Sequence, residues 1–433
     1  MRIPCSGVDY FHHVLHRMIQ DHGGPGNHGQ VRLELDCALD DARLDSAWRS
    51  LGRQAWILAA QLRLGLRGAW WQVRGPAQLE LERGEDLAQL AQEQLRGGLP
   101  EAGPRLRLGY ARASAAGPAG VVLTWDHRLC DARAALGVLS RLSQLADGQS
   151  LRDPWWRPGQ RHIAGLPPTR AAQGALARQS VQHLKPHRYA TLWRPQVPAG
   201  NPAAPVEVLQ LAFSAAETAS VDQRQVTASG RFSETPFLLA ALSASLEEVG
   251  GVHGDVLFPV AIDARPRQGG PLLANCHSFL FLRLQAGVAT RDLTVAARAL
   301  KEAHRYWVAQ EMSLKMAAAM EFFPLVGERI ARAQLGYFRA GVAASCLVAN
   351  TGQSSAPSEL FGAQVTGIRH AATVPGMPGL AALFHRQGRR LCCDLIAAGA
   401  VRQALPLARL RERLRYQLLE RPLQGQALAA PGG

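Results

Sequence analysis

His127 and Asp131 are the residues of this chain whose types and spacing best suit acid–base chemistry. A largely apolar run at residues 121–125 follows a turn rich in glycine and proline and predicts a buried strand ending just before His127. From Asp131 the apolar residues recur at helical spacing, so His127 is expected in a strand-to-helix turn, projecting into a cleft. Imidazole has the side-chain pKa nearest neutrality and can take up and release a proton. The alternative is a histidine that only fills the turn, with Asp131 as the helix cap, and spacing alone does not separate the two.

The segment Asp126-His127-Arg128-Leu129-Cys130-Asp131-Ala132 resembles the His-His-x-x-x-Asp-Gly motif of the chloramphenicol acetyltransferase-like superfamily. That group includes nonribosomal peptide condensation domains, polyketide-associated acyltransferases, wax ester synthases and plant alcohol acyltransferases. The resemblance implies that His127 is catalytic and that Asp131 is structural, holding an arginine in a salt bridge away from the substrate. Asp126 stands in place of the first histidine of the motif, and Ala132 in place of its glycine. An Asp126 carboxylate that faced the ring of His127 would raise the pKa of that histidine.

Further site residues are implied by the same resemblance. The strand expected at residues 256–265 ends in Arg265, and an Asn-x-x-x strand begins at residue 275, an order similar to that of the family. Arg265 is therefore the expected partner of Asp131, with Arg267 as the alternative; a surface arginine in a loop is the competing interpretation of Arg265. Candidate donors to a tetrahedral oxyanion are the Ser278 hydroxyl, the Asn350 amide and backbone N–H groups, among which the sequence does not choose.

Three histidines, His12, His13 and His16, fall on a helix expected at residues 8–22. His12 and His16 have the i, i+4 spacing that can ligate a metal. Because no third ligand is evident nearby, a solvated polar face is the favoured interpretation, and no metal site is expected.

The composition favours a cytoplasmic bacterial protein with an anionic partner. The formal charge is +14 and arises almost entirely from arginine, a bias typical of a GC-rich genome. Since no basic run is interleaved with aromatic residues, no nucleic acid is expected as partner. The resemblance of the motif implies coenzyme A or an acidic acyl carrier protein instead. The seven dispersed cysteines favour reduced thiols, and the sequence predicts neither a signal peptide nor a membrane span.

The strand and helix patterns restart after a proline-rich stretch at residues 149–205, where long regular elements are not expected, although a helix could fit between Thr169 and His183. The prediction is an α/β protein with two chloramphenicol acetyltransferase-like lobes, each a mixed β-sheet flanked by helices, and a cleft between them. The N-terminal lobe is expected at residues 1–165, a crossover linker at 166–205 and the C-terminal lobe at 206–433.

The expected function is acyl transfer from a thioester on coenzyme A or on a phosphopantetheine arm to a hydroxyl or amine acceptor, giving an ester or amide. His127 would be the general base. No covalent acyl-enzyme is implied, because the sequence lacks a Gly-x-Ser-x-Gly motif, and no bound cofactor is expected. The chain is expected to be a monomer. The alternative is a non-catalytic condensation-like module that binds an acyl carrier protein.

Overall fold

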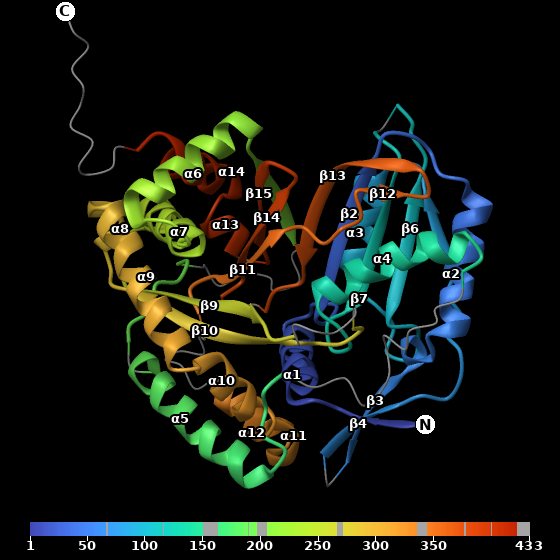
Figure 1. Cartoon of the computed structure of the whole chain (residues 1–433), viewed down its shortest axis with the longest axis horizontal. Helices are drawn as coiled ribbons and strands as arrows, with labels where there is room; N and C mark the ends of the chain where they lie inside the picture. Colours follow the sequence, from blue (N-terminus) through green and yellow to red (C-terminus); the bar gives the residue numbers. More distant parts are fainter. Residues whose placement is uncertain are drawn as a thin grey trace, which may run out of the picture.

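Two lobes lie side by side, each built on a six-stranded sheet (Figure 1). The computed structural model describes residues 1–65, 68–115, 117–149, 163–188, 190–196, 206–265, 272–335, 344–375, 378–399 and 401–421. The N-terminal sheet has the order β12-β13-β2-β7-β6-β5, and the C-terminal sheet the order β10-β9-β11-β14-β15-β8. The predicted arrangement of two mixed α/β lobes is confirmed.

The N-terminal sheet has helices on both of its faces. Its strands from this half of the chain are β2 (His28–Leu35), β5 (Leu81–Gly84), β6 (Leu106–Ala111) and β7 (Gly120–Asp126). Helices α2 (Asp41–Gln54) and α4 (Ala132–Ala146) share one core with Val121 and Leu123 of β7, whereas α3 (Leu87–Gly97) packs on Val122 from the opposite side. Because β7 is covered on both faces, all of its residues are buried, which explains its continuous apolar sequence.

A small sheet and one helix complete the N-terminal region. Strands β1 (Arg2–Pro4), β4 (Gly68–Gln72) and β3 (Gln61–Gly65) form a three-stranded sheet, and the short helix η1 (Trp56–Ala59) precedes β3. Helix α1 (Gly7–Asp21) begins at a capping box in which the Ser6 side chain accepts the Asp9 N–H and the Asp9 side chain accepts the Ser6 N–H.

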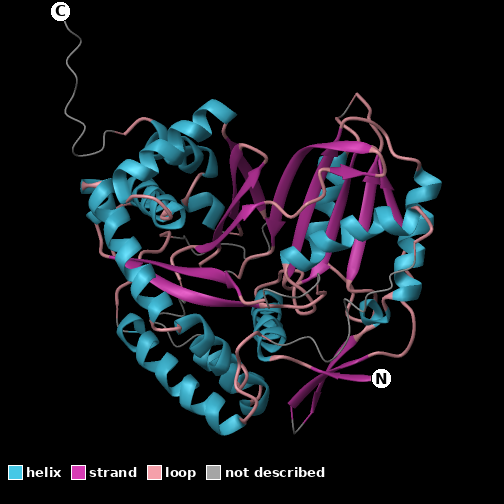
Figure 2. Ribbon diagram, viewed as in Figure 1, coloured by secondary structure: helices cyan, strands magenta, loops and turns pink. Residues whose placement is uncertain are grey.

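The C-terminal sheet carries most of its helices on one face (Figure 2). Its strands are β8 (Glu207–Ala212), β9 (Val256–Asp263), β10 (His277–Leu284), β11 (Leu347–Gln353), β14 (Leu380–Gln387) and β15 (Arg390–Ala397). That face is covered by α6 (Ala215–Ser229), α7 (Glu234–Gly250), α8 (Val288–Arg291), α9 (Leu293–Ala309), α13 (Val401–Ala404) and α14 (Leu407–Leu419). Below β9 and β10 in Figure 1 lie α5 (Arg170–Arg188), α10 (Met312–Met320), α11 (Phe323–Val326) and α12 (Glu328–Leu335).

The sequence halves do not correspond strictly to the two sheets. Strands β12 (Glu359–Leu360) and β13 (Ala363–Ala372) lie within the predicted C-terminal lobe, yet β13 pairs antiparallel with β2 and completes the N-terminal sheet. A period-two pattern predicts a strand but carries no information about the sheet that the strand joins. The crossing of β13 connects the two lobes through continuous backbone.

The expected linker contains more regular structure than the proline content predicts. The 19-residue helix α5 extends the helix expected between Thr169 and His183 and packs against α10. Its one proline, Pro186, lies in the last turn. Most of the other prolines of the stretch fall within residues 150–162 and 197–205, outside the described residues.

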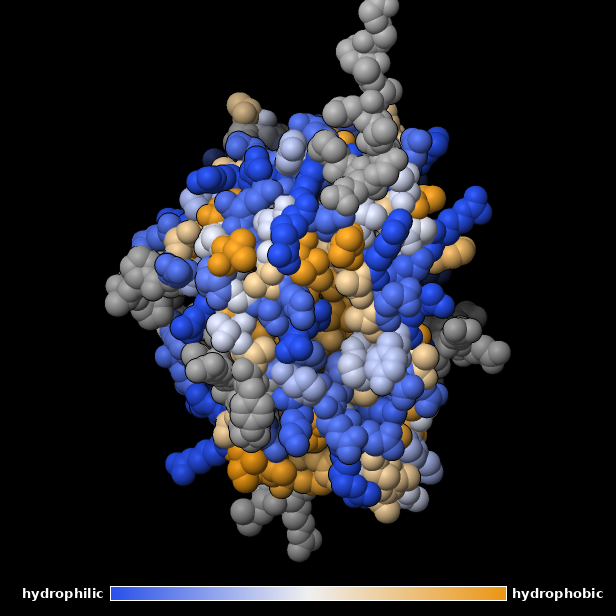
Figure 3. All heavy atoms as spheres, turned by 90° about the vertical axis from the view of Figure 1, so that its left-hand side faces the viewer, coloured by the Kyte–Doolittle hydropathy of each residue, from blue (hydrophilic) through white to orange (hydrophobic). Residues whose placement is uncertain are grey.

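The surface mixes polar and apolar residues. On the face in Figure 3, which is the left-hand side of Figure 1, hydrophobic residues are interspersed among hydrophilic ones. Exposed apolar residues of α9 include Val295, Tyr306 and Val308. No helix within the described residues is long and apolar enough to cross a membrane.

Candidate active site

His127 lies in the predicted strand-to-helix turn. Strand β7 ends at Asp126, α4 begins at Ala132, and the Asp131 carboxylate caps α4 by accepting the Ala134 N–H at 3.0 Å. The backbone N–H of His127 donates to the Asn27 carbonyl at 3.1 Å. The turn is therefore fixed at both ends by backbone and cap contacts, and the side chain of His127, which is half-buried, projects from a rigid support.

Asp131 also makes the predicted contact with Arg265. Nη2 of Arg265 donates to Asp131 Oδ1 at 2.6 Å, and the other carboxylate oxygen accepts the Cys276 N–H at 3.0 Å. Although burial raises the pKa of Asp131, its contacts with His277 and Arg265 outweigh burial and hold the pKa well below its usual value. Asp131 is thus both the helix cap and the partner of Arg265. The alternative partner, Arg267, lies outside the described residues.

The loop between β9 and β10 holds the motif turn against α1. The side-chain amide nitrogen of Asn275 lies 2.9 Å from the His127 carbonyl, 3.1 Å from the Arg128 carbonyl and 3.0 Å from Asp9 Oδ1. Asp131 N–H donates to the Ala274 carbonyl at 3.5 Å. A loop of the C-terminal lobe therefore binds the turn that carries His127, and the histidine lies where the two lobes meet.

Two further imidazoles surround His127. The ring of His12 stacks on that of His127, with centroids 4.0 Å apart and an interplanar angle of 19°. The ring of His277 approaches His127 edge-on, with a centroid distance of 6.0 Å. His12 and His277 face each other through their Nε2 atoms at 3.0 Å. Residues far apart in the sequence, from α1, the motif turn and β10, thus form one cluster.

The surroundings of His127 keep its imidazole neutral near neutral pH. Burial, followed by the neighbouring His277, lowers the pKa of His127 to about 4, and Asp131 and Asp126 oppose this shift only in part. Nδ1 of the ring is buried and makes no hydrogen bond to another described residue, whereas Nε2 is not among the buried atoms that lack a partner. The ring is therefore neutral at pH 7 and could accept a proton.

The prediction that the histidine-bearing face of α1 is exposed to solvent is wrong. His12, His13 and His16 are exposed by only 5%, 7% and 0% of their surfaces, because α1 packs against α10, α11, α12 and the motif turn. The polar residues of this face alone predicted exposure to solvent. Inside the protein, however, His12 lies against His277, His13 against Glu328 and His16 against Glu101. Within the described part of the chain, no group of three or more His, Cys, Asp or Glu side chains could hold a metal ion.

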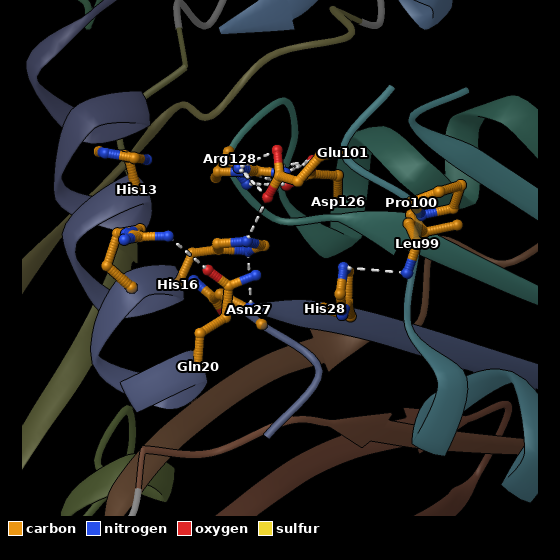
Figure 4. A network of polar contacts seen from close by, with 12 residues as sticks. His13, His16, Gln20, Asn27, His28, Leu99, Pro100, Glu101, Asp126 and Arg128 are labelled. Carbon is orange, nitrogen blue, oxygen red and sulfur yellow. Dashed lines mark hydrogen bonds and ion pairs between the residues drawn. The ribbon is translucent and has the colours of Figure 1, made fainter. Parts of the chain in front are cut away.

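Asp126 does not face the His127 ring. It lies in a buried network in which its carboxylate accepts from Arg105 Nη1 at 2.9 Å and from Arg128 Nη2 at 2.7 Å (Figure 4). Arg128 also donates to Glu101 at 3.0 Å, and Glu101 contacts His16 Nε2 at 2.8 Å. Burial tends to raise the pKa of Asp126, but the two arginines hold it well below its usual value. The negative charge is thus compensated locally, and its upward effect on the pKa of His127 is outweighed by burial.

The two candidate side-chain donors to an oxyanion are engaged elsewhere. The Ser278 hydroxyl donates to the Ser313 carbonyl at 2.5 Å, and the Asn350 amide donates to Thr235 Oγ1 at 3.0 Å. No contact in the described regions joins either residue to His127. Successive side chains of a strand point to opposite faces, so His277 at the start of β10 faces the cluster and Ser278 faces away from it.

Sequence comparison gives no match for this chain: no family model and no curated protein matches it. Comparison with solved structures, in contrast, finds proteins of similar fold. The first condensation domain of the CDA synthetase is 19% identical, with a TM-score of 0.69 over 97% of each chain. Polyketide synthase associated protein 5 from Mycobacterium tuberculosis is 14% identical, with a TM-score of 0.66 over 97% of this chain and 100% of that one. Trichothecene 15-O-acetyltransferase TRI3 from Fusarium sporotrichioides is 12% identical, with a TM-score of 0.68 over 96% and 95%.

These likenesses extend over nearly the whole length of every chain compared. The protein therefore has the two-lobed chloramphenicol acetyltransferase-like fold, as the motif at residues 126–132 predicts. At identities of 12% to 19% the likeness is one of fold.

Proposed function

We propose that this protein is an acyltransferase that moves an acyl group from a thioester, on coenzyme A or on the phosphopantetheine arm of a carrier protein, to a hydroxyl or amine acceptor, with His127 as general base. The observation that carries the proposal is the place of His127, on a turn held from both lobes where they meet, and burial there lowers the pKa of its imidazole to about 4. The fold, shared with condensation domains and an acetyltransferase, supports the same reaction class.

In the proposed reaction, His127 Nε2 takes the proton from the acceptor while the acceptor oxygen or nitrogen attacks the thioester carbonyl. The tetrahedral intermediate then collapses with cleavage of the carbon–sulfur bond. The His127 imidazolium returns its proton to the departing thiolate, so the free thiol and the ester or amide are the products. No residue of the protein is acylated, and the base is regenerated in each cycle.

Asp131 has a supporting role in this proposal. One of its carboxylate oxygens accepts from Ala134 and Arg265, and the other from Cys276, so its hydrogen-bonding capacity is occupied by the protein. A carboxylate in these contacts braces the turn rather than accepting a proton from substrate. Its partner Arg265 also donates to Asp263 at 3.0 Å, which extends the brace to the end of β9.

The test is turnover of a panel of acyl thioesters with alcohols and amines, followed by thiol release. His127→Ala should lose about 10²- to 10⁴-fold in kcat, the usual contribution of a positioned base, with little change in melting temperature. His22→Ala, which removes an exposed histidine just beyond α1, is the control and should behave as wild type.

Equal turnover by wild type and His127→Ala would remove the assignment of His127. A folded wild type that turns over no donor but binds an acyl carrier protein would favour the alternative, a non-catalytic condensation-like module.

A further inference from the structure

We propose that His12 is a positioning residue for His127: its ring, fixed in one tautomer by Asn27, is the neutral face against which His127 takes up a proton. This inference rests on the proposed function and goes beyond it, because it assigns a role to a residue outside the motif. It is carried by the stacking of the two rings and by the direction of the hydrogen bonds around His12.

The stacking restricts the orientation of His127. The two ring centroids lie 4.0 Å apart with planes only 19° from parallel, so the face of His12 lies flat against that of His127. The His127 ring has a hydrogen bond to its own backbone, and its buried Nδ1 makes no hydrogen bond to another described residue. The face of His12 is therefore a packing contact that limits rotation of the His127 ring.

The tautomer of His12 follows from its neighbours. The Asn27 side-chain nitrogen lies 2.9 Å from His12 Nδ1 and 3.4 Å from the His12 carbonyl. A carbonyl only accepts, so this Asn27 atom is the donating NH₂ group, and His12 Nδ1 is an acceptor. The proton of neutral His12 is then on Nε2, and it points at His277 Nε2 at 3.0 Å.

The same reasoning continues to Asp131. His277 Nε2 accepts from His12, so the proton of a neutral His277 is on Nδ1, which lies 3.7 Å from Asp131 Oδ2. Hydrogen bonds thus run from Asn27 through His12 to His277, and Nδ1 of His277 lies near the carboxylate that braces the motif turn.

Neutrality of His12 matters for the chemistry. When His127 takes the proton of the acceptor, the new cation lies against an uncharged aromatic face, which attracts it. A protonated His12 at the same place would repel it. Burial, followed by the proximity of His127 and His277, lowers the pKa of His12 well below its usual value, in agreement with this role.

The other groups that act electrostatically on His127 are few among the described residues. His277 approaches from β10, and Asp126 and Asp131 come from its own turn. Both carboxylates are paired with arginines, and the His12 ring is the one that lies flat against His127.

The experiment compares His12→Ala, which removes the ring, with His12→Phe, which keeps an aromatic face but none of the hydrogen bonds. His13→Phe is the matched control, since His13 is equally buried on the same helix but contacts Glu328 instead of the cluster. The first readout is the titration of His127, followed by NMR of the histidine rings. The His127 signal is assigned as the one that disappears in His127→Ala. The second readout is whether each variant changes kcat, KM or both.

In wild type, the His127 signal should titrate near pH 4. In His12→Ala the midpoint should move up toward the ordinary value of about 6.5, because the ring gains water. It should stay near the wild-type midpoint in His12→Phe and in His13→Phe. We expect His12→Ala to lose about 10- to 100-fold in kcat with KM within threefold, and His12→Phe to lose less than tenfold.

A His127 midpoint unchanged in His12→Ala would overturn the proposal, as would equal loss of kcat in His12→Ala and His12→Phe. If His12→Ala does not fold, the comparison of His12→Phe with His13→Phe still decides: a moved midpoint in the former would contradict a role for the aromatic face. Failure of the acyltransferase proposal would be seen as absent turnover or as full activity of His127→Ala. Because the titration needs no substrate, that failure is distinguishable from failure of the proposal for His12.

Discussion

Replacing Asp126 by asparagine should destabilise the protein strongly without touching the reacting groups. Asp126 is completely buried and is paired with Arg105 and Arg128, which are exposed by 1% and 3%. Removing one partner of a buried ion pair typically costs about 3–5 kcal/mol, because the remaining charge is left uncompensated. Here both arginines keep other partners: Glu101 for Arg128, and backbone carbonyls for Arg105. We therefore expect a loss near the lower limit, about 3 kcal/mol.

The assay is urea-induced and thermal unfolding at pH 7. For lobes of this size a loss of about 3 kcal/mol corresponds to a decrease of roughly 6–12 °C in melting temperature. The control is Glu302→Gln, which removes the carboxylate of a surface pair with Arg305 whose side chains are 69% and 68% exposed. That change should stay within about 0.5 kcal/mol.

The dependence on pH provides a second check. The arginines hold the pKa of Asp126 well below its unfolded value, so the stabilisation is complete above about pH 4 and is lost as the pH falls toward the lower, folded-state pKa. The difference between wild type and Asp126→Asn should therefore be largest at pH 7 and decrease below pH 4. Adding Arg128→Met to Asp126→Asn should cost less than the sum of the single changes. A loss below about 1 kcal/mol at pH 7, or an additive double variant, would refute the role of this network.

Three further predictions concern the motif turn, the base and a second buried carboxylate. Asp131→Ala should lose about 3–5 kcal/mol of stability together with activity, because Arg265 loses its buried partner. A variant that is as stable as wild type but turns over slowly would instead indicate that Asp131 is catalytic. The kcat/KM of wild type should rise with pH through about 4 and be flat between pH 6 and 8, because the neutral form of His127 is active; a limb centred at or above 6.5 would contradict this. Burial raises the pKa of Asp394 to about 7, so the folded state retains a proton that the unfolded state loses near pH 4. The stability of wild type relative to Asp394→Asn should therefore fall between about pH 4 and pH 7, as measured by unfolding in a series of buffers, and a constant difference would exclude the shifted pKa.

The local part of the site could be predicted from the sequence because neighbouring residues determine it. The apolar run before His127, the cap at Asp131 and the helical stripe after it specify a strand, a turn and a helix. The pairing of Asp131 with Arg265 spans 134 residues and was available only through the resemblance to a family, not from spacing.

The remaining part of the site depends on contacts between distant elements. His12, His127 and His277 come from α1, the motif turn and β10, and nothing in their local sequence reports that they meet. A polar helix face is usually solvated, but His12 and His16 of α1 can be buried because Asn27, Glu101 and His277 supply partners for their nitrogens. One signal was available: strand alternation places His277 and Ser278 on opposite faces, so they could not both point to the cluster.

The two departures from the motif have physical explanations in this fold. A glycine is required where the backbone adopts a positive φ or where a side chain has no room. Ala132 is instead the first residue of α4 and is not among the described non-glycine residues with positive φ, so a methyl group is compatible with the turn. At position 126 the replacement introduces a charge, and buried charges are tolerated only when paired. Arg105 and Arg128 supply that pairing, so the turn keeps its support while burial keeps the His127 imidazole neutral.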